Sequence, residues 1–145
     1  MYVIGERING MFKSVRGAIE EGDKRVIHEL ALAQINAGAD ALDINVGPAK
    51  GDALGSLHWL IDTVREVTDV PLSIDNPKWA IQQDVIPRLG SGAIINSCKA
   101  DPEILDKYMA LAVEHGAGLV ALTIDKQGVP ADIEKRVELG AQIGA

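Results

Sequence analysis

Five short apolar runs recur along the chain, separated by longer segments whose apolar residues lie at helical spacing. Each run is rich in leucine or β-branched residues and is nearly continuous, which is typical of strands buried on both faces of a parallel sheet. The expected strands are residues 2–5, 41–47, 71–75, 92–97 and 118–125. The pattern therefore predicts an α/β chain of about five βα units.

The segments between the runs carry apolar residues three and four positions apart, as the buried face of a helix does. We expect Asp23 to cap the first helix and Gly38 to lie just beyond its end. The expected buried positions, helix by helix, are Val26, Ile27, Leu30 and Ala31; Leu57, Leu60, Ile61 and Val64; Trp79, Ile81, Val85 and Leu89; Ile104, Leu105, Tyr108, Leu111 and Ala112; and Ile133, Val137 and Ile143.

Consecutive βα units are compatible with two architectures. An open doubly wound sheet suits a chain of 145 residues, whereas a (β/α)8 barrel typically takes about 250 residues. Length alone favours the open sheet. The sequence has neither G-x-G-x-x-G nor a P-loop to support a nucleotide site in such a sheet.

Composition narrows the function classes. The net charge is −7 and aromatic residues make up 3% of the chain, which argues against nucleic-acid binding because phosphates require basic surface and single strands require stacking rings. Cys98 is the one cysteine, so no internal disulfide forms, which suits a reducing cytoplasm. No apolar run has membrane-spanning length, no signal peptide is visible, and no Cys/His cluster has metal-site spacing.

Polar side chains gather at the carboxyl ends of the expected strands, where both architectures place their sites. They are Glu6, Arg7 and Asn9; Asp43 and Asn45; Asp75; Asn96 and Ser97; and Thr123 and Asp125. Many such residues are simply helix caps.

Two of these residues are left over once caps are assigned. Asn76-Pro77 suits a cap and a first helical position, and Asp101-Pro102 does the same after the next strand. Asp75 and Asn96 then require another partner. A carboxylate accepts two N–H bonds and an amide both donates and accepts, so the pair suits a flat heterocycle with an amino–imino edge, such as a pterin, a guanine-like ring or an amidine.

Basic residues follow the same strand ends in this acidic chain. They are Arg7, Lys50, Lys78, Lys99 and Lys126. They are either ordinary loop charges, since acids such as Asp52 and Asp101 lie there too, or contacts to an anionic ligand tail or phosphate.

The motifs "IGERING", "ALDINVGP", "SIDN", "IINS" and "LTIDKQGVP" together resemble the methyltetrahydrofolate:corrinoid protein methyltransferases of anaerobic bacteria. These enzymes belong to the pterin-binding superfamily, with dihydropteroate synthase and the folate module of cobalamin-dependent methionine synthase. The resemblance runs through the whole chain in order. The "NVTPDSFSDGG"-type loop of dihydropteroate synthase is absent, and "INGMFKSV" stands in its place.

The resemblance implies a (β/α)8 barrel with the pterin at its C-terminal face, which overrides the argument from length. Residues 1–145 would then be the N-terminal part of one pterin-binding domain, with about five of eight units, and "ELGAQIGA" would stop in mid-helix. We expect a piece of a longer barrel or a chain completed by another, impaired on its own. The family further implies a cytoplasmic homodimer with no nucleic acid and no membrane.

Site residues follow from the matching motifs. The resemblance implies that Asp75 and Asn96 bind the pterin and serve catalysis. Asp43 and Asn45 would line the floor of the pocket. The other matched positions are Ser97 beside Asn96, Asn9 and Gly10-Met11 in a loop near the corrinoid, and Thr123 and Lys126 as contacts to the corrinoid.

The implied reaction moves a methyl group between N5 of (methyl)tetrahydrofolate and the cobalt of a corrinoid (cobalamin type). A partner corrinoid protein or corrinoid iron–sulfur protein would carry that corrinoid. The residues leave open the direction and the pathway: acetyl-CoA synthesis, O-demethylation, or betaine or methylamine use. Two alternatives also stay open, another pterin enzyme of dihydropteroate synthase type and a non-catalytic half-barrel that acts as an assembly module.

Overall fold

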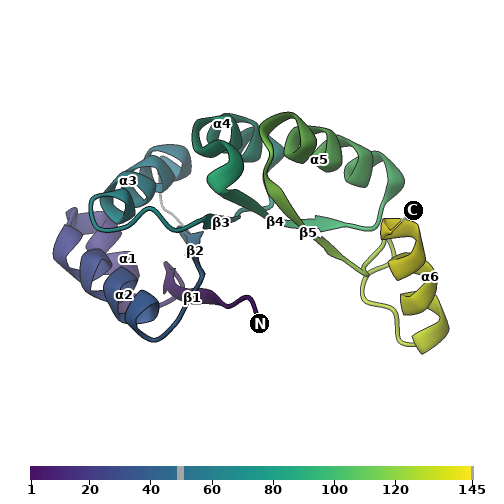
Figure 1. Ribbon diagram of the computed structural model, residues 1–145, viewed down its shortest axis with the longest axis horizontal. Helices are drawn as coiled ribbons and strands as arrows, with labels where there is room; N and C mark the ends of the chain where they lie inside the picture. Colours follow the sequence, from purple (N-terminus) through teal and green to yellow (C-terminus); the bar gives the residue numbers. More distant parts are fainter. Residues whose placement is uncertain (49–50, 145) are drawn as a thin grey trace. The chain divides into compact units, whose positions relative to one another are not determined.

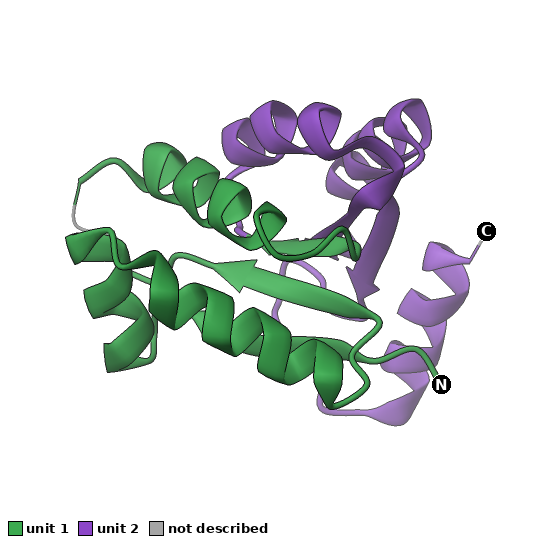
Figure 2. Ribbon diagram, turned by 60° about the vertical axis from the view of Figure 1, so that its left-hand side comes forward, with its two compact units in different colours: residues 1–75 green, residues 76–145 purple. Residues whose placement is uncertain are grey.

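A computed structural model describes residues 1–48 and 51–144 of the chain, so Lys50 lies outside the described residues. The chain divides into two compact units, residues 1–75 and residues 76–145 (Figure 2). Strands and helices alternate along both (Figure 1). The expectation of an α/β chain of about five βα units is confirmed, and every described strand belongs to a parallel pair.

The first unit is a three-stranded parallel sheet, ordered β1-β2-β3, with its helices packed against it. Its strands are β1 (Ile4–Asn9), β2 (Ala41–Asn45) and β3 (Leu72–Asp75), and its helices are α1 (Lys13–Glu21), α2 (Lys24–Asn36) and α3 (Ala53–Arg65). Helices α2 and α3 contact each other and lie on β1 and β2. The sequence pattern missed α1, which buries only Val15 and Ala18 and starts without a side-chain cap.

Burial in this unit follows the predicted helical faces. Asp23 caps α2 by accepting from the Arg25 N–H at 3.0 Å, as expected. The four predicted positions of α3, from Leu57 to Val64, are at most 1% exposed. On α2, Ile27 and Ala31 are buried, whereas the other two predicted positions, Val26 and Leu30, are half-buried. Removal of such side chains from water is the main stabilising term for the unit.

Strand β1 differs from its prediction. It begins at Ile4 and continues to Asn9, and its register against β2 shifts between Gly5 and Ile8. Glu6 and Arg7 occupy this irregularity and are exposed, so they lie within the strand and not beyond its end. A bulge of this kind inserts a residue without a pairing partner, which apolar periodicity does not reveal.

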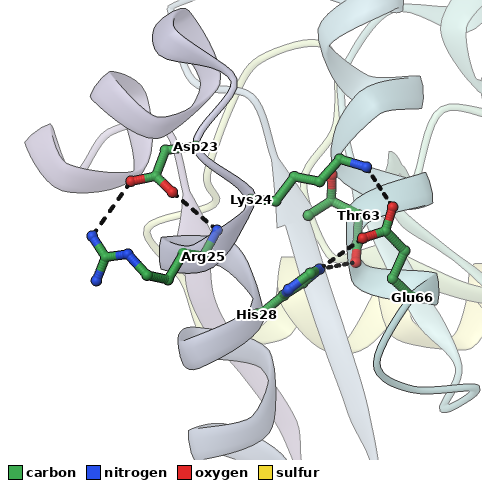
Figure 3. A network of polar contacts seen from close by, with 6 residues as sticks. All are labelled: Asp23, Lys24, Arg25, His28, Thr63 and Glu66. Atoms are coloured by element: carbon green, nitrogen blue, oxygen red, sulfur yellow. Dashed lines mark hydrogen bonds and ion pairs between the residues drawn. The ribbon is translucent and has the colours of Figure 1, made fainter.

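A polar network joins α2 to the end of α3 (Figure 3). Lys24 Nζ lies 2.5 Å from Glu66 Oε1, and His28 Nε2 lies 3.1 Å from both Glu66 Oε2 and the Thr63 carbonyl oxygen. The hydrogen bond from Lys24 lowers the pKa of the Glu66 carboxyl. The network is partly exposed, so we assign it the small stabilising effect typical of surface ion pairs.

The second unit pairs β4 (Ala93–Lys99) with β5 (Gly118–Leu122) in parallel. Its helices are α4 (Trp79–Leu89), the 3-10 turn η1 (Gly90–Gly92), α5 (Pro102–His115) and α6 (Ile133–Ile143). Helices α4 and α5 contact each other and β4. The Asp101 side chain caps α5 and Pro102 begins it, both as predicted.

One helical face and one further position in this unit were predicted wrongly. Ile133 and Val137 of α6 are 75% and 65% exposed, and Leu139, at 2%, is the buried anchor of that helix. On α5, Ile104 is exposed while Leu105 is buried. No described helix is long and apolar enough to span a membrane.

Candidate functional site

Asp75 closes β3 and is held by Asn45, which closes β2. Asn45 Nδ2 donates to Asp75 Oδ2 at 2.6 Å, and the Gly47 N–H donates to Asn45 Oδ1 at 2.6 Å. Both side chains are half-buried. The expectation that Asp75 does not cap a helix is confirmed, and its partner in the first unit is an amide on the neighbouring strand.

The prediction that Asn76 caps the following helix and that Pro77 begins it was wrong. Helix α4 begins at Trp79, and its N-cap is Lys78, without a side-chain bond. Asn76 forms a tight turn before the helix, where its Oδ1 accepts from the Lys78 N–H at 3.0 Å. Its carbonyl accepts from Gln82 Nε2 at 2.9 Å. Asn and Asp commonly form such turns, which compete with capping for the same side-chain oxygen.

Asp43, predicted for the pocket floor, is 3% exposed. The Ser73 hydroxyl donates to its Oδ1 at 2.5 Å, so the pair ties β2 to β3. A buried carboxylate needs such donors to offset the loss of water. The structure therefore gives Asp43 a partner within the sheet.

The loop after β1 is fixed by hydrogen bonds at both ends. Asn9 Oδ1 accepts from the Met11 N–H at 2.9 Å. Arg16 donates from Nε to the Gly10 carbonyl and from Nη2 to the Met11 carbonyl, both at 3.1 Å. The Gly10 N–H donates to the Asn45 carbonyl at 2.8 Å, which joins this loop to the end of β2.

Two large apolar side chains stand exposed on that loop. Met11 is 63% exposed and Phe12 is 40% exposed. The Arg7 guanidinium lies 4.2 Å from the centroid of the Phe12 ring, within cation–π range. The loop thus presents an apolar surface whose backbone is fixed and joined to Asn45.

Asn96 lies inside β4, and not at its end as predicted. The strand continues to Lys99, and its register against β5 shifts between Asn96 and Cys98, which pair with Val120 and Ala121. Ser97 is the extra residue of this bulge, and both Asn96 and Ser97 are half-buried. Bulges re-aim side chains next to many active sites.

A hollow of about 280 Å³, which the sequence pattern did not predict, lies beside the end of β4. Its lining is Pro77, Trp79, Ser97, Cys98, Lys99, Ile104, Lys107 and Tyr108. The Trp79 and Tyr108 rings lie 5.0 Å apart at 54°, and Lys107 Nζ lies 4.1 Å from the Trp79 centroid. The sequence predicted both rings as buried positions of two separate helices. Their contact across those helices is visible only in the structure.

Cys98 should be unreactive in the folded protein. It is 3% exposed, and burial raises the pKa of its thiol, which keeps the sulfur protonated at neutral pH. Because the thiolate is the nucleophile, we expect Ellman's reagent to modify Cys98 at pH 7.5 only after denaturant unfolds the chain. A prompt reaction in native buffer would contradict the burial.

Lys126, predicted as a corrinoid contact, pairs with the cap of α5. Its Nζ lies 3.0 Å from Asp101 Oδ2, and Asp101 is 3% exposed. The hydrogen bond from Lys126 lowers the pKa of the Asp101 carboxyl, and the same bond raises the pKa of Lys126. Thr123 is half-buried, and Lys126 itself is exposed.

Because Asp101 pairs with Lys126, we expect the stability of the fold to depend on pH. A carboxyl with a lowered folded pKa stabilises the fold above its unfolded value of about 3.9, and that stabilisation disappears as pH falls through the folded pKa. Asp101→Asn keeps a good N-cap but removes the charge that pairs with Lys126. It should therefore unfold at a lower temperature than the parent at pH 7, and this difference should disappear as the pH falls through the lowered folded pKa of Asp101. Equal unfolding temperatures of Asp101→Asn and the parent at pH 7 would contradict a stabilising role for this ion pair.

The remaining predicted cations have separate surroundings. Lys78 and Lys99 are exposed, and Lys99 lines the hollow described above. Arg7 lies over Phe12. Among the described residues, no group of three or more His, Cys, Asp or Glu side chains could hold a metal ion.

Comparison of the sequence with known proteins identifies the family of the chain. The profile of the pterin binding enzymes matches residues 8–141. The chain is 38% identical over 141 residues to a methylcorrinoid:tetrahydrofolate methyltransferase of Eubacterium limosum, covering 96% of this chain and 52% of that protein. It is 33% identical over 147 residues to methionine synthase of Mycobacterium tuberculosis, covering 97% of this chain and 12% of that protein.

The chain thus spans about half the length of the first relative and a smaller share of the methionine synthase. The βα order and the family match agree with the predicted partial (β/α)8 barrel. The resemblance drawn from the motifs is confirmed. Because the profile covers nearly all of the sequence, the chain belongs to the pterin binding enzyme family.

Proposed function

We propose that the protein containing residues 1–145 is a methyltransferase that moves a methyl group between N5 of tetrahydrofolate and a corrinoid on a partner protein. The observation that carries the proposal is the carboxylate of Asp75, which ends a buried strand, caps no helix and is oriented by Asn45. Because the chain belongs to the pterin binding family, the pterin ring is the ligand that we assign to this carboxylate.

Asp75 is proposed to anchor the pterin. A carboxylate is an acceptor only, so it matches the side-by-side N–H groups of the pterin's amino–imino edge. Asn45 Nδ2 donates one hydrogen bond to Asp75 Oδ2 at 2.6 Å. A carboxylate offers about four lone-pair sites, so acceptor capacity remains for ring N–H groups.

Asn96, on β4 of the second unit, is proposed as a further pterin-binding residue, as the matching motif implies. Its amide both donates and accepts, which suits a ring nitrogen or the oxo group. N5 is a poor leaving group until it gains positive charge. Hydrogen bonds that strengthen as N5 is protonated stabilise the transition state more than the ground state, and polar groups held in place supply this without reorganisation.

The loop after β1 is proposed to meet the corrinoid partner. Met11 and Phe12 offer exposed apolar surface, and Asn9 and Arg16 fix the backbone beneath them. An exposed apolar patch on a fixed loop is typical of an interaction site. A corrinoid supplies a cobalt atom that accepts or donates the methyl group. Thr123 and Lys126 are proposed as further contacts to that partner.

The proposal is tested with the full-length protein, 5-methyltetrahydrofolate and a reduced corrinoid protein. Tetrahydrofolate should appear, measured by chromatography, only when all three are present. Calorimetry should show binding of tetrahydrofolate and none of p-aminobenzoate. Binding of p-aminobenzoate together with a pterin pyrophosphate, without methyl transfer, would instead identify an enzyme of dihydropteroate synthase type.

A further inference from the structure

We infer that Asn45 is a positioning residue, which holds the Asp75 carboxylate in one orientation for the ligand. The inference rests on the proposed function, because it assigns to Asp75 the role of pterin anchor. It goes further by naming the part of the chain that orients the anchor.

The Asn45 amide has its two ends fixed by different partners. Its Oδ1 accepts from the Gly47 N–H at 2.6 Å, so its Nδ2 is turned towards Asp75, also at 2.6 Å. A flipped amide would place an oxygen against the carboxylate and an N–H against an N–H. Both contacts would be repulsive, so only one amide orientation is compatible with this geometry.

The backbone on which Asn45 and Gly47 lie is also held. The Asn45 carbonyl accepts from the Gly10 N–H at 2.8 Å. Gly47 has φ +66°, and a Cβ there would lie 2.5 Å from the Gly10 carbonyl carbon. The donor that orients Asn45 is therefore fixed by close packing of two loops, and a larger residue fits at neither glycine.

This chain of contacts settles what Asn45 does for Asp75. A half-buried carboxylate with one anchored oxygen has fewer rotamers to lose when a ring binds, so less of the binding energy is spent on ordering it. One Nδ2 hydrogen and one Oδ1 lone pair of the amide are used in the two bonds that orient the carboxylate. Asn45 thus supports the anchor from the sheet, and the ligand meets the carboxylate.

A double-mutant cycle on tetrahydrofolate affinity tests the inference in the full-length protein. Asn45→Ala should weaken binding about tenfold. In the Asp75→Asn background, Asn45→Ala should lower the affinity for tetrahydrofolate less than about twofold, because Asn45 affects binding by orienting the Asp75 carboxylate. Asn36→Ala, at the exposed end of α2, removes an amide elsewhere and should change nothing.

The isosteric change Asn45→Asp separates positioning from packing. It keeps an acceptor for the Gly47 N–H but places a second carboxylate against Asp75, so it should weaken binding more than Asn45→Ala does. Unfolding temperatures of all variants are measured in parallel, so that affinity is compared only between folded proteins.

The outcomes separate the inference from the proposed function. If the parent binds tetrahydrofolate and Asp75→Asn weakens it, but Asn45→Ala costs the same in both backgrounds, Asn45 does not act through Asp75 and the inference is wrong. A milder effect of Asn45→Asp than of Asn45→Ala would also overturn it, in favour of packing. If the folded parent binds no tetrahydrofolate, the proposed function fails first and the inference fails with it.

Discussion

Asp75→Asn should weaken tetrahydrofolate binding by about 1–3 kcal/mol, roughly 5- to 150-fold. The substituted amide has nearly the same shape as the carboxylate, so packing at the end of β3 is preserved. It loses the charge and turns one acceptor oxygen into a donor. Asn45 Nδ2 would still find the remaining oxygen, which leaves the new NH₂ facing the ring N–H groups of the ligand. A charge-assisted bond is thereby replaced by a repulsive contact.

Isothermal titration calorimetry of the full-length protein with tetrahydrofolate measures this difference directly. Asp106→Asn, on the exposed face of α5, removes the same charge elsewhere and should leave affinity unchanged. Equal affinity of the parent and Asp75→Asn would exclude Asp75 as the pterin anchor. Such a result would leave membership of the family untouched, because that rests on the whole sequence.

The parts of the fold that were predictable are those in which burial alone decides the pattern. Leu57 and Val64 lie on one face of α3 at helical spacing and are buried as expected. The Asp101-Pro102 start of α5 was predictable for a local reason, because capping depends on neighbours in sequence. Both kinds of signal are contained within a few consecutive residues.

The errors arose where distant segments decide the outcome. The bulges in β1 and at Ser97 depend on pairing with another strand and leave no trace in apolar periodicity. In α6, Leu139 is buried, whereas Ile133 and Val137 are exposed. A stripe identifies an apolar face, but the tertiary contacts determine which residues are covered.

In the candidate site, too, the features set by nearby residues were predictable and those set by distant segments were not. Asn45 and Asp75 were both recognisable as polar ends of buried strands. Their hydrogen bond was not, because it depends on the parallel register that pairs Leu42 with Leu72 and Ile44 with Ile74. A shift of one residue would turn either side chain to the opposite face of the sheet. The spacing of residues within one strand does not identify which residue lies opposite on the next strand.

Gly10→Ala should destabilise the chain and weaken folate binding together. A Cβ on residue 10 would lie 2.1 Å from the Val46 carbonyl oxygen and 2.9 Å from the Gly47 nitrogen. These are backbone atoms and cannot rotate away, so the loops after β1 and β2 must separate. Overpacking of this kind typically costs about 1–3 kcal/mol, and the Gly10 N–H bond to the Asn45 carbonyl at 2.8 Å would be strained as well.

Gly17→Ala is the matched control, because a Cβ at this position in α1 meets nothing within 4 Å. Alanine is favoured over glycine inside a helix by roughly 0.5–1 kcal/mol, so this variant should be slightly more stable than the parent. Urea unfolding followed by circular dichroism gives both free energies of unfolding, and calorimetry gives the affinities. Opposite signs for the two alanines are expected, since only residue 10 lies where the two loops touch. Equal stability of Gly10→Ala and the parent would show that these loops do not meet, which would also remove the support that Gly47 gives to Asn45.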